Sequence, residues 1–197
     1  MTDECREAET EMANFTRKAI KETFLELLEE RPLSDITVKN IVERCEINRN
    51  SFYYHYANIP TLLEEIIKED AELIIQNYPS VSTIVECFDA VTAFAARRKK
   101  VIMHIYRSMG REVFEHHLMM VCEYFVTSYL QTALAEEPIL EADKKTVIDY
   151  YKCVCFGLII NWLNNGMAES YTQSIRRIFL LKKDLAMEIA KLLQNQI

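Results

Sequence analysis

The sequence predicts an all-α protein, and three observations support this prediction. Only three glycines and four prolines occur among its 197 residues, whereas the two together usually make up roughly 12% of a chain. A barrel or sandwich of many short strands needs more turn-forming residues than that. Half of the residues are hydrophobic, and along most of the chain they recur three or four positions apart, as on one face of an amphipathic helix. We therefore expect about nine helices and no strand.

Capping residues delimit the first four predicted helices. Thr37 and Asn48 are suited to cap the second and third, because their side-chain oxygens can accept hydrogen bonds from the first turn of a helix. Asn58 and Pro60 suit the start of the fourth, since a proline in the first turn lacks only an N–H that would have no helical partner. These helices are expected at residues 14–31, 38–45, 49–55 and 58–77.

Breaks are fewer in the rest of the sequence, which predicts longer helices. Gly110 and Gly166 each end one of them, and a loop is expected around Pro138. Apolar stripes place these helices at residues 82–98, 100–109, 112–135, 142–165 and 174–195. An acidic segment precedes all nine, because residues 1–13 contain five acidic side chains and a single arginine.

The motifs that are missing exclude several classes of enzyme. Glycines at positions 110, 157 and 166 cannot form a P-loop or a GxGxxG dinucleotide-binding turn, and HExxH and GxSxG are also absent. Spacing indicates no acid and base pair either, so we expect neither an enzyme nor a cofactor. No run of about 18 uninterrupted apolar residues suggests a membrane span. The acidic N-terminus does not resemble a signal peptide, and a cytoplasmic protein is expected.

The net charge and the cysteine spacing further limit the classes of protein to which this chain could belong. The net charge of −7 argues against a general polyanion binder, so only a local patch is expected to meet nucleic acid. The six cysteines form no CxxC pair and no zinc-like spacing. In a reducing cytosol we expect free thiols packed as small hydrophobic side chains. A redox sensor around Cys153 and Cys155 is the alternative.

A helix-turn-helix pattern occupies residues 37–56, TVKNIVERCEINRNSFYYHY. Two short helices are joined by a tight connection, and the second opens on a polar turn that a core helix would lack. Phe52 and Tyr56 are four positions apart and can face a small core. Arg49 and Tyr54 then project outward, where arginine can bind guanine edges and hydroxyls can reach phosphates. The pattern predicts that the second helix lies in the major groove of DNA.

The run from Ile41 to Tyr56, IVERCEINRNSFYYHY, followed by Leu62, resembles the TetR/AcrR family of one-component transcriptional regulators. The resemblance is close over residues 14–74, and the run FGLIINWLNNG that begins at Phe156 is similar to the family's regulatory domain. It implies an all-helical homodimer of two domains after the acidic tail. The implied organisation is a tail at 1–13, a DNA-binding domain at 14–74 with its helix-turn-helix at 37–56 and a linking helix at 58–77, and a ligand-binding and dimerisation domain at 78–197.

Members of this family are usually repressors that a small molecule releases from DNA. The resemblance therefore implies a ligand-responsive repressor that binds a palindromic operator. The residues expected to contact DNA are Thr16, Arg17, Lys18, Thr37, Lys39, Asn48, Arg49, Asn50, Ser51, Tyr53, Tyr54 and His55.

Two departures from the family pattern affect this interpretation. Most members have glycine in the turn where this chain has Glu46, so a residue with a side chain is expected to need a positive φ there. The lysines that many members carry after the recognition helix are Ala57 and Ile59 here. Attraction to the DNA backbone, and with it the salt dependence of binding, is expected to be moderate.

Aromatic and thioether side chains are frequent in the C-terminal part, and at helical spacing most such residues belong to a core. The functional alternative is an apolar pocket between helices with a few polar groups. The candidate ligand-binding residues are Met103, His104, Tyr106, His117, Tyr124, Tyr151 and Asn161. His116 and His117 lie near two glutamates, but the chain has no Glu-x-x-His pair for a di-metal site, so no metal is expected.

Apolar stripes on the last two predicted helices indicate a dimer interface. Two such helices from each protomer would form an intermolecular four-helix bundle. The alternative is a helical hairpin within one chain. The candidate dimerisation residues are Val154, Leu158, Trp162, Ile178, Leu181, Leu185 and Ile189.

The leading hypothesis is a dimeric, sequence-specific DNA-binding regulator. Its expected partners are a double-stranded DNA operator, a second copy of the chain and a small-molecule effector. The first alternative is a regulator whose C-terminal domain binds a protein partner. The second is a helical-bundle ligand carrier or enzyme, for which no catalytic residue can be named.

Overall fold

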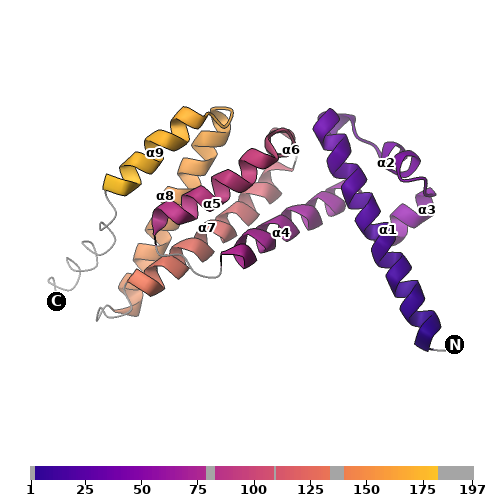
Figure 1. Cartoon of the computed structure of the whole chain (residues 1–197), viewed down its shortest axis with the longest axis horizontal. Helices are drawn as coiled ribbons and strands as arrows, with labels where there is room; N and C mark the ends of the chain where they lie inside the picture. The colour runs from indigo at the N-terminus through magenta and orange to yellow at the C-terminus, as the bar shows by residue number, and fades with distance from the viewer. Residues whose placement is uncertain (1–2, 79–82, 109, 134–139, 182–197) are drawn as a thin grey trace. The chain divides into compact units, whose positions relative to one another are not determined.

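The computed structural model describes residues 3–78, 83–108, 110–133 and 140–181 (Figure 1). Every regular element within these ranges is helical, which confirms the all-α prediction. The α-helices are α1 (Asp3–Glu30), α2 (Val38–Arg44), α3 (Arg49–His55), α4 (Ile59–Asn77), α5 (Ile84–Arg97), α6 (Lys99–Tyr106), α7 (Arg111–Ala133), α8 (Glu141–Asn164) and α9 (Glu169–Leu181), and a short 3₁₀ helix spans Leu33–Asp35.

The chain folds as two compact units. Among the described residues, the first comprises 3–68, 100–108 and 110–114, and the second comprises 69–78, 83–99, 115–133 and 140–181. α4 contributes to both, because its residues up to 68 belong to the first unit and the rest to the second. Most of α6 and the start of α7 belong with the helix-turn-helix rather than with the second unit.

The core of the first unit combines side chains from α1, α2, α3, α4 and α6. Phe24 of α1, Phe52 of α3 and Leu62 of α4 are fully buried in it. Removing such a side chain from water stabilises the fold by about 1.5–3 kcal/mol. His104 of α6 adds a polar contact, since its Nδ1 lies 2.7 Å from the carbonyl oxygen of Leu28 near the end of α1. These contacts anchor α2 and α3, the two helices of the helix-turn-helix, on the core of the first unit.

The first helix differs from the expectation at its N-terminal end. α1 begins at Asp3 rather than near Asn14, so it includes most of the acidic segment. Phe15, near the start of the helix expected from the sequence, is 75% exposed. It lies five and nine positions before Ile20 and Phe24, which is about 140° and 180° around a helix. Phe15 therefore cannot share their buried face.

The second unit is built around α5, α7, α8 and α9. The rings of Phe88 on α5 and Phe179 on α9 meet edge to face, with their centroids 5.6 Å apart. An ion pair of 3.1 Å between Asp89 and Arg176 joins the same two helices. α9 begins at Glu169, five residues before the position predicted from the sequence, and the residues after 181 lie outside the described part of the chain.

α8 carries apolar residues on two sides. Its inner side buries five side chains in the second unit, namely Val147, Cys155, Ile159, Trp162 and Leu163. Among the described helices it is the one long and apolar enough to cross a membrane, with an 18-residue window of mean hydropathy 1.2. A third of that window is buried inside the protein. The core helix of a water-soluble protein has the same composition, so length and hydropathy alone do not assign α8 to a bilayer.

Candidate functional site

Side-chain caps position both helices of the helix-turn-helix. The Oγ1 of Thr37 accepts a hydrogen bond from the Asn40 backbone N at 3.3 Å, and the Asn40 Oδ1 accepts one from the Thr37 backbone N at 2.9 Å. At the start of α3 the Asn48 Oδ1 accepts a hydrogen bond from the Ser51 backbone N at 2.8 Å. Both caps confirm the sequence prediction, and each contributes about 1 kcal/mol. Three of the predicted DNA contacts, at positions 37, 48 and 51, therefore help to fix the helices.

The turn between α2 and α3 contains a left-handed residue that is not glycine. Glu46 has a φ of 56°, as the sequence led us to expect. The next residue closes the turn, since the Ile47 backbone N donates a hydrogen bond to the Val42 carbonyl oxygen at 3.0 Å. A side chain in this backbone region meets a steric cost that glycine avoids.

Replacing Glu46 with Gly is expected to raise the free energy of unfolding by about 0.5–1 kcal/mol. The gain is modest because glycine also makes the unfolded chain more flexible, which offsets part of the relieved strain. Urea denaturation at pH 7 measures the change. Glu46→Gln keeps the strained backbone and removes only the charge, so it should stay within about 0.5 kcal/mol of the wild type. A glycine variant less stable than the wild type would show that the turn is not strained.

The outward face of α3 presents polar and aromatic groups to solvent. Arg49 and Asn50 are exposed, as is Tyr53, and Tyr54 is 80% exposed. On the opposite side Phe52 is fully buried and packs edge to face against the Tyr53 ring, with centroids 5.5 Å apart. α3 is therefore anchored on one side and free to contact a partner on the other. Its groups match those that bind base edges and phosphates.

One carboxylate on α4 joins three groups from α1 and from the end of α3. Glu65 Oε1 accepts hydrogen bonds of 2.9 Å from Arg17 Nε and from the Tyr56 hydroxyl, and it lies 2.6 Å from Lys21 Nζ. Burial favours the neutral acid, but the bonds from these three partners outweigh it and lower the pKa of Glu65 to about 2. Burial and the bond to Glu65 raise the pKa of Tyr56, which lies in the core as predicted. The guanidinium of Arg17, a predicted DNA contact, is thus engaged inside the first unit.

The remaining predicted DNA contacts lie on the surface of the first unit. Lys18 and Lys39 are exposed, and each ammonium lies within 4 Å of a glutamate one turn further along its helix. The Thr16 hydroxyl donates a hydrogen bond of 3.0 Å to a backbone carbonyl one turn earlier. Burial and the nearby charge of Arg17 lower the pKa of His55 and so favour its neutral form.

The seven predicted ligand-binding residues are divided between the two units. The first unit contains Met103, His104 and Tyr106, and the second contains His117, Tyr124, Tyr151 and Asn161. Met103 and Tyr106 are buried, whereas Asn161 is exposed. The Tyr124 hydroxyl donates a hydrogen bond of 3.3 Å to the Tyr78 carbonyl oxygen. None of the seven lines the cavity described next.

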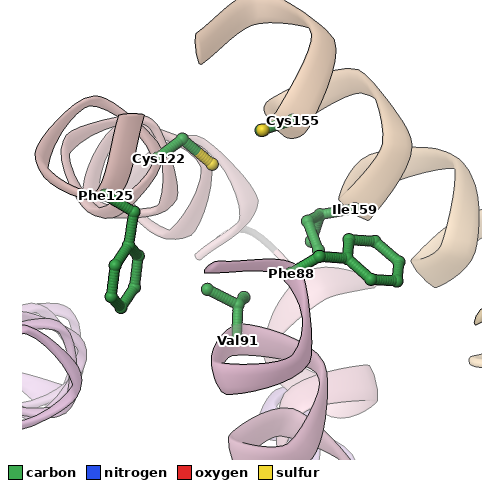
Figure 2. A pocket seen from close by; sticks show the side chains of 6 residues that line it. All are labelled: Phe88, Val91, Cys122, Phe125, Cys155 and Ile159. Atoms are coloured by element: carbon green, nitrogen blue, oxygen red, sulfur yellow. The ribbon is translucent and has the colours of Figure 1, made fainter. Parts of the chain in front are cut away.

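A small cavity lies within the second unit, between α5, α7 and α8. Its volume is about 10 Å³, and it is lined by Phe88, Val91, Cys122, Phe125, Cys155 and Ile159 (Figure 2). Burial raises the pKa of Cys155 to about 12, so its thiol is protonated at neutral pH. Neither cavity cysteine forms a disulfide, which agrees with the predicted thiols. The sequence did not predict this cavity, because the apolar pattern of these residues is the same as that of a fully packed core.

Two of the candidate dimerisation residues on α8 lie at the surface and one does not. Val154 and Leu158 are half-buried and follow a row that begins at Tyr150, an exposed residue. Trp162 is 2% exposed, so its side chain is buried within the chain and presents no surface to a second copy. Ile178 and Leu181 of α9 are exposed, while Leu185 and Ile189 lie outside the described residues.

Comparisons with known proteins match both parts of the chain. Residues 22–66 match the bacterial regulatory proteins of the tetR family, and residues 82–184 match a transcriptional regulator C-terminal region. A curated relative is the uncharacterized HTH-type transcriptional regulator YxbF of Bacillus subtilis (strain 168), which is 28% identical over 159 residues. That match covers 78% of this chain and 40% of the relative, so the chain spans about two fifths of the relative's length.

Two solved structures are similar in fold. The dihydroxyacetone kinase operon activator DhaS has a TM-score of 0.60 at 19% identity, and the match covers 92% of this chain and 96% of that chain. Salmonella enterica GusR has a TM-score of 0.58 at 17% identity, over 89% and 95% of the two chains. At these identities the likeness concerns the fold alone.

Proposed function

Because this chain belongs to the TetR family of bacterial transcriptional regulators, we propose that it binds a palindromic operator as a homodimer and that a ligand controls this binding. As a member of that family it is a DNA-binding regulator and not an enzyme. The observation that best supports α3 as the reading helix is its division into a buried side at Phe52 and an exposed side that carries Arg49 and Tyr54.

Within this proposal the exposed groups of α3 have different roles. Arg49 pairs with a guanine edge and Asn50 with an adenine, because their side chains offer the matching donors and acceptors. Tyr53 and Tyr54 reach phosphates through their hydroxyls. Lys39 adds a phosphate contact from α2. Arg17 instead holds α1 on α4 through Glu65, since its guanidinium already has a carboxylate partner.

The proposed dimer interface is the outer side of α8 together with α9. Tyr150, Cys153, Gly157 and Asn161 are exposed at helical spacing on the side of α8 opposite its buried residues, and the half-buried Val154 and Leu158 add apolar surface beside them. A helix that is apolar on both sides is usually covered on both. A second copy would cover this side with the same surface, and Gly157, whose Cβ position is open space, would permit close approach of two helices. We therefore propose that the outer side of α8 contacts a second copy of the chain rather than a membrane.

The proposed control site lies in the second unit. The cavity between α5, α7 and α8 is apolar and small, so a ligand that fills it stabilises one arrangement of these helices over others. α4 is continuous from the second unit into the first, and a change at its C-terminal end can reach the helix-turn-helix through the chain. We propose that the ligand-bound form releases DNA, which makes the protein a repressor.

Selection of duplex DNA from a random pool tests this function. The wild-type chain should enrich an inverted repeat whose half-sites lie about 34–36 Å apart, or a multiple of that distance, because a twofold dimer presents two copies of α3. A single non-repeated site would contradict the dimer. A failure to enrich any sequence would contradict sequence-specific binding.

The same selected site allows a test of the interface. Leu158→Glu places a charge in the proposed contact and should convert the protein to a monomer, with operator affinity reduced by about tenfold or more. Met120→Glu is the matched control, since Met120 is an exposed apolar residue on α7, outside the proposed interface. Sedimentation velocity measures the mass of each variant. A dimeric Leu158→Glu protein would place the interface elsewhere.

A further inference from the structure

Two sulfur atoms face the same cavity from different helices. Cys122 belongs to α7 and Cys155 to α8, and their side chains are 3% and 7% exposed. Both line the cavity of the second unit, and Figure 2 shows their sulfur atoms directed toward one hollow. Cys153, two positions from Cys155, is exposed on the other side of α8. The pairing in the cavity is therefore a property of the fold and not of sequence spacing.

The rest of the lining is carbon. Phe88 and Val91 come from α5, Phe125 comes from α7 and Ile159 comes from α8. A volume of about 10 Å³ is near the minimum for one water molecule, which also needs two to four polar partners. Two weakly bonding thiols do not supply them. A cavity of this size would have to open to admit an organic effector, whereas a single ion is far smaller and both sulfur atoms face the same hollow.

We infer that Cys122 and Cys155 form a two-coordinate site for a soft divalent metal ion, of which mercury(II) is the best match. Thiolates are soft ligands and select soft metal ions. As each sulfur–metal bond forms, the thiol loses its proton to water, so one ion replaces two protons. The product is neutral, because two thiolate charges cancel the double positive charge of the ion.

Neutrality distinguishes this ion from other thiol-binding metals. Copper(I) between two thiolates would leave one negative charge, and no charged side chain lines the cavity to compensate it. Zinc prefers four ligands, and the described residues contain no group of three or more His, Cys, Asp or Glu that could hold a metal. The role of this ion as an effector rests on the proposed function, because it requires that the cavity be the site that controls DNA binding.

Metal retention by the full chain tests the site directly. The purified protein is mixed with one equivalent of mercury(II) chloride and excess glutathione, separated from small molecules, and analysed for metal content. The wild type should retain one ion per chain, because two preorganised thiols compete better than separate ones. Cys122→Ala and Cys155→Ala should each reduce retention by about tenfold or more. Cys45→Ala and Cys153→Ala are matched controls and should retain the ion.

Several outcomes would overturn the inference. Equal retention by the wild type and by the Cys122→Ala and Cys155→Ala variants would place the metal on other thiols. Loss of the ion from the wild type to glutathione would show that the pair does not bind as a unit. Cys122→Val and Cys155→Val keep the cavity filled, so that each position can still be tested if an alanine variant does not fold.

DNA binding is measured separately, so that the two proposals can fail independently. Wild-type protein that binds its selected operator but retains no mercury(II) refutes the metal site and leaves the DNA-binding function intact. One equivalent of the ion should lower operator affinity of the wild type by about tenfold or more, and it should not affect the Cys122→Ala/Cys155→Ala double variant. Retention of the ion without a change in DNA affinity would overturn its assignment as the effector.

Discussion

Replacing Arg49 with Ala is expected to weaken operator binding by about 1–3 kcal/mol, a factor between about five and more than one hundred. Arg49 is the cation in the first turn of α3, and its exposed side chain is the one suited to bind a guanine edge with two hydrogen bonds. The fold should be unaffected, because truncation of an exposed side chain changes stability by no more than about 0.5 kcal/mol. Fluorescence anisotropy with the selected operator measures the loss.

Salt titration separates the two ways in which Arg49 could bind DNA. A phosphate contact would lower the slope of log affinity against log salt by about one unit and weaken all sequences alike. A base contact would leave the slope unchanged and reduce discrimination at one base pair. Arg107→Ala is the matched control, because Arg107 is an exposed arginine of the same unit outside the helix-turn-helix. Equal losses for Arg49→Ala and Arg107→Ala would mean that α3 does not read the operator.

Tyr54→Ala provides a second probe of the same surface. The Tyr54 ring meets His55 edge to face, with centroids 5.0 Å apart, and makes no contribution to the core. Tyr54→Phe, which removes only the hydroxyl, should reproduce most of the loss if that group binds a phosphate.

Local features of the fold could be predicted from the sequence because local physics determines them. Thr37 and Asn48 cap their helices through groups three positions away. Glu46 stands in a left-handed turn because the short connection requires it, whatever residue is present. Phe52 and Tyr56 face the core as their spacing of four predicts. Each of these predictions uses residues within one turn of each other.

Features that join distant parts of the chain could not be predicted in the same way. Arg17 and Glu65 are 48 positions apart, and nothing in either neighbourhood indicates that they pair. Cys122 and Cys155 share a cavity only because α7 and α8 pack together. The position of residues 100–114 in the first unit likewise depends on their burial against α1 and α4. An apolar stripe predicts that a helix face is buried, but it does not specify the partner.

Among the contacts between distant parts of the chain, those made by Glu65 are expected to have the largest effect on stability. Glu65→Gln should lower the free energy of unfolding at pH 7 by about 2 kcal/mol, between the values typical of surface and buried ion pairs. Glutamine offers one acceptor oxygen, and its amide would direct donors at Arg17 and Lys21, which are themselves donors. Because α1 and the end of α3 lose a shared partner, operator affinity should fall as well.

The pH dependence of this effect follows from the sign of the pKa shift. The carboxyl group has a pKa of about 2 in the folded protein and an ordinary value of 4.5, so the unfolded chain binds the proton more tightly. The stabilisation is complete above pH 4.5 and is lost as the pH falls from there toward 2. The difference in stability between the wild type and Glu65→Gln should therefore be large at pH 7 and much smaller at pH 3.

Urea denaturation at the two pH values measures this difference without adding salt that would screen the ion pairs. Glu64→Gln is the matched control, since Glu64 is the adjacent, exposed glutamate on α4. It should differ little from the wild type at either pH. If Glu65→Gln were as stable as the wild type at pH 7, the interactions with the three partners would only offset the cost of burying the carboxylate. The first helix would then be held in the first unit by the apolar core, to which Ile20 and Phe24 belong.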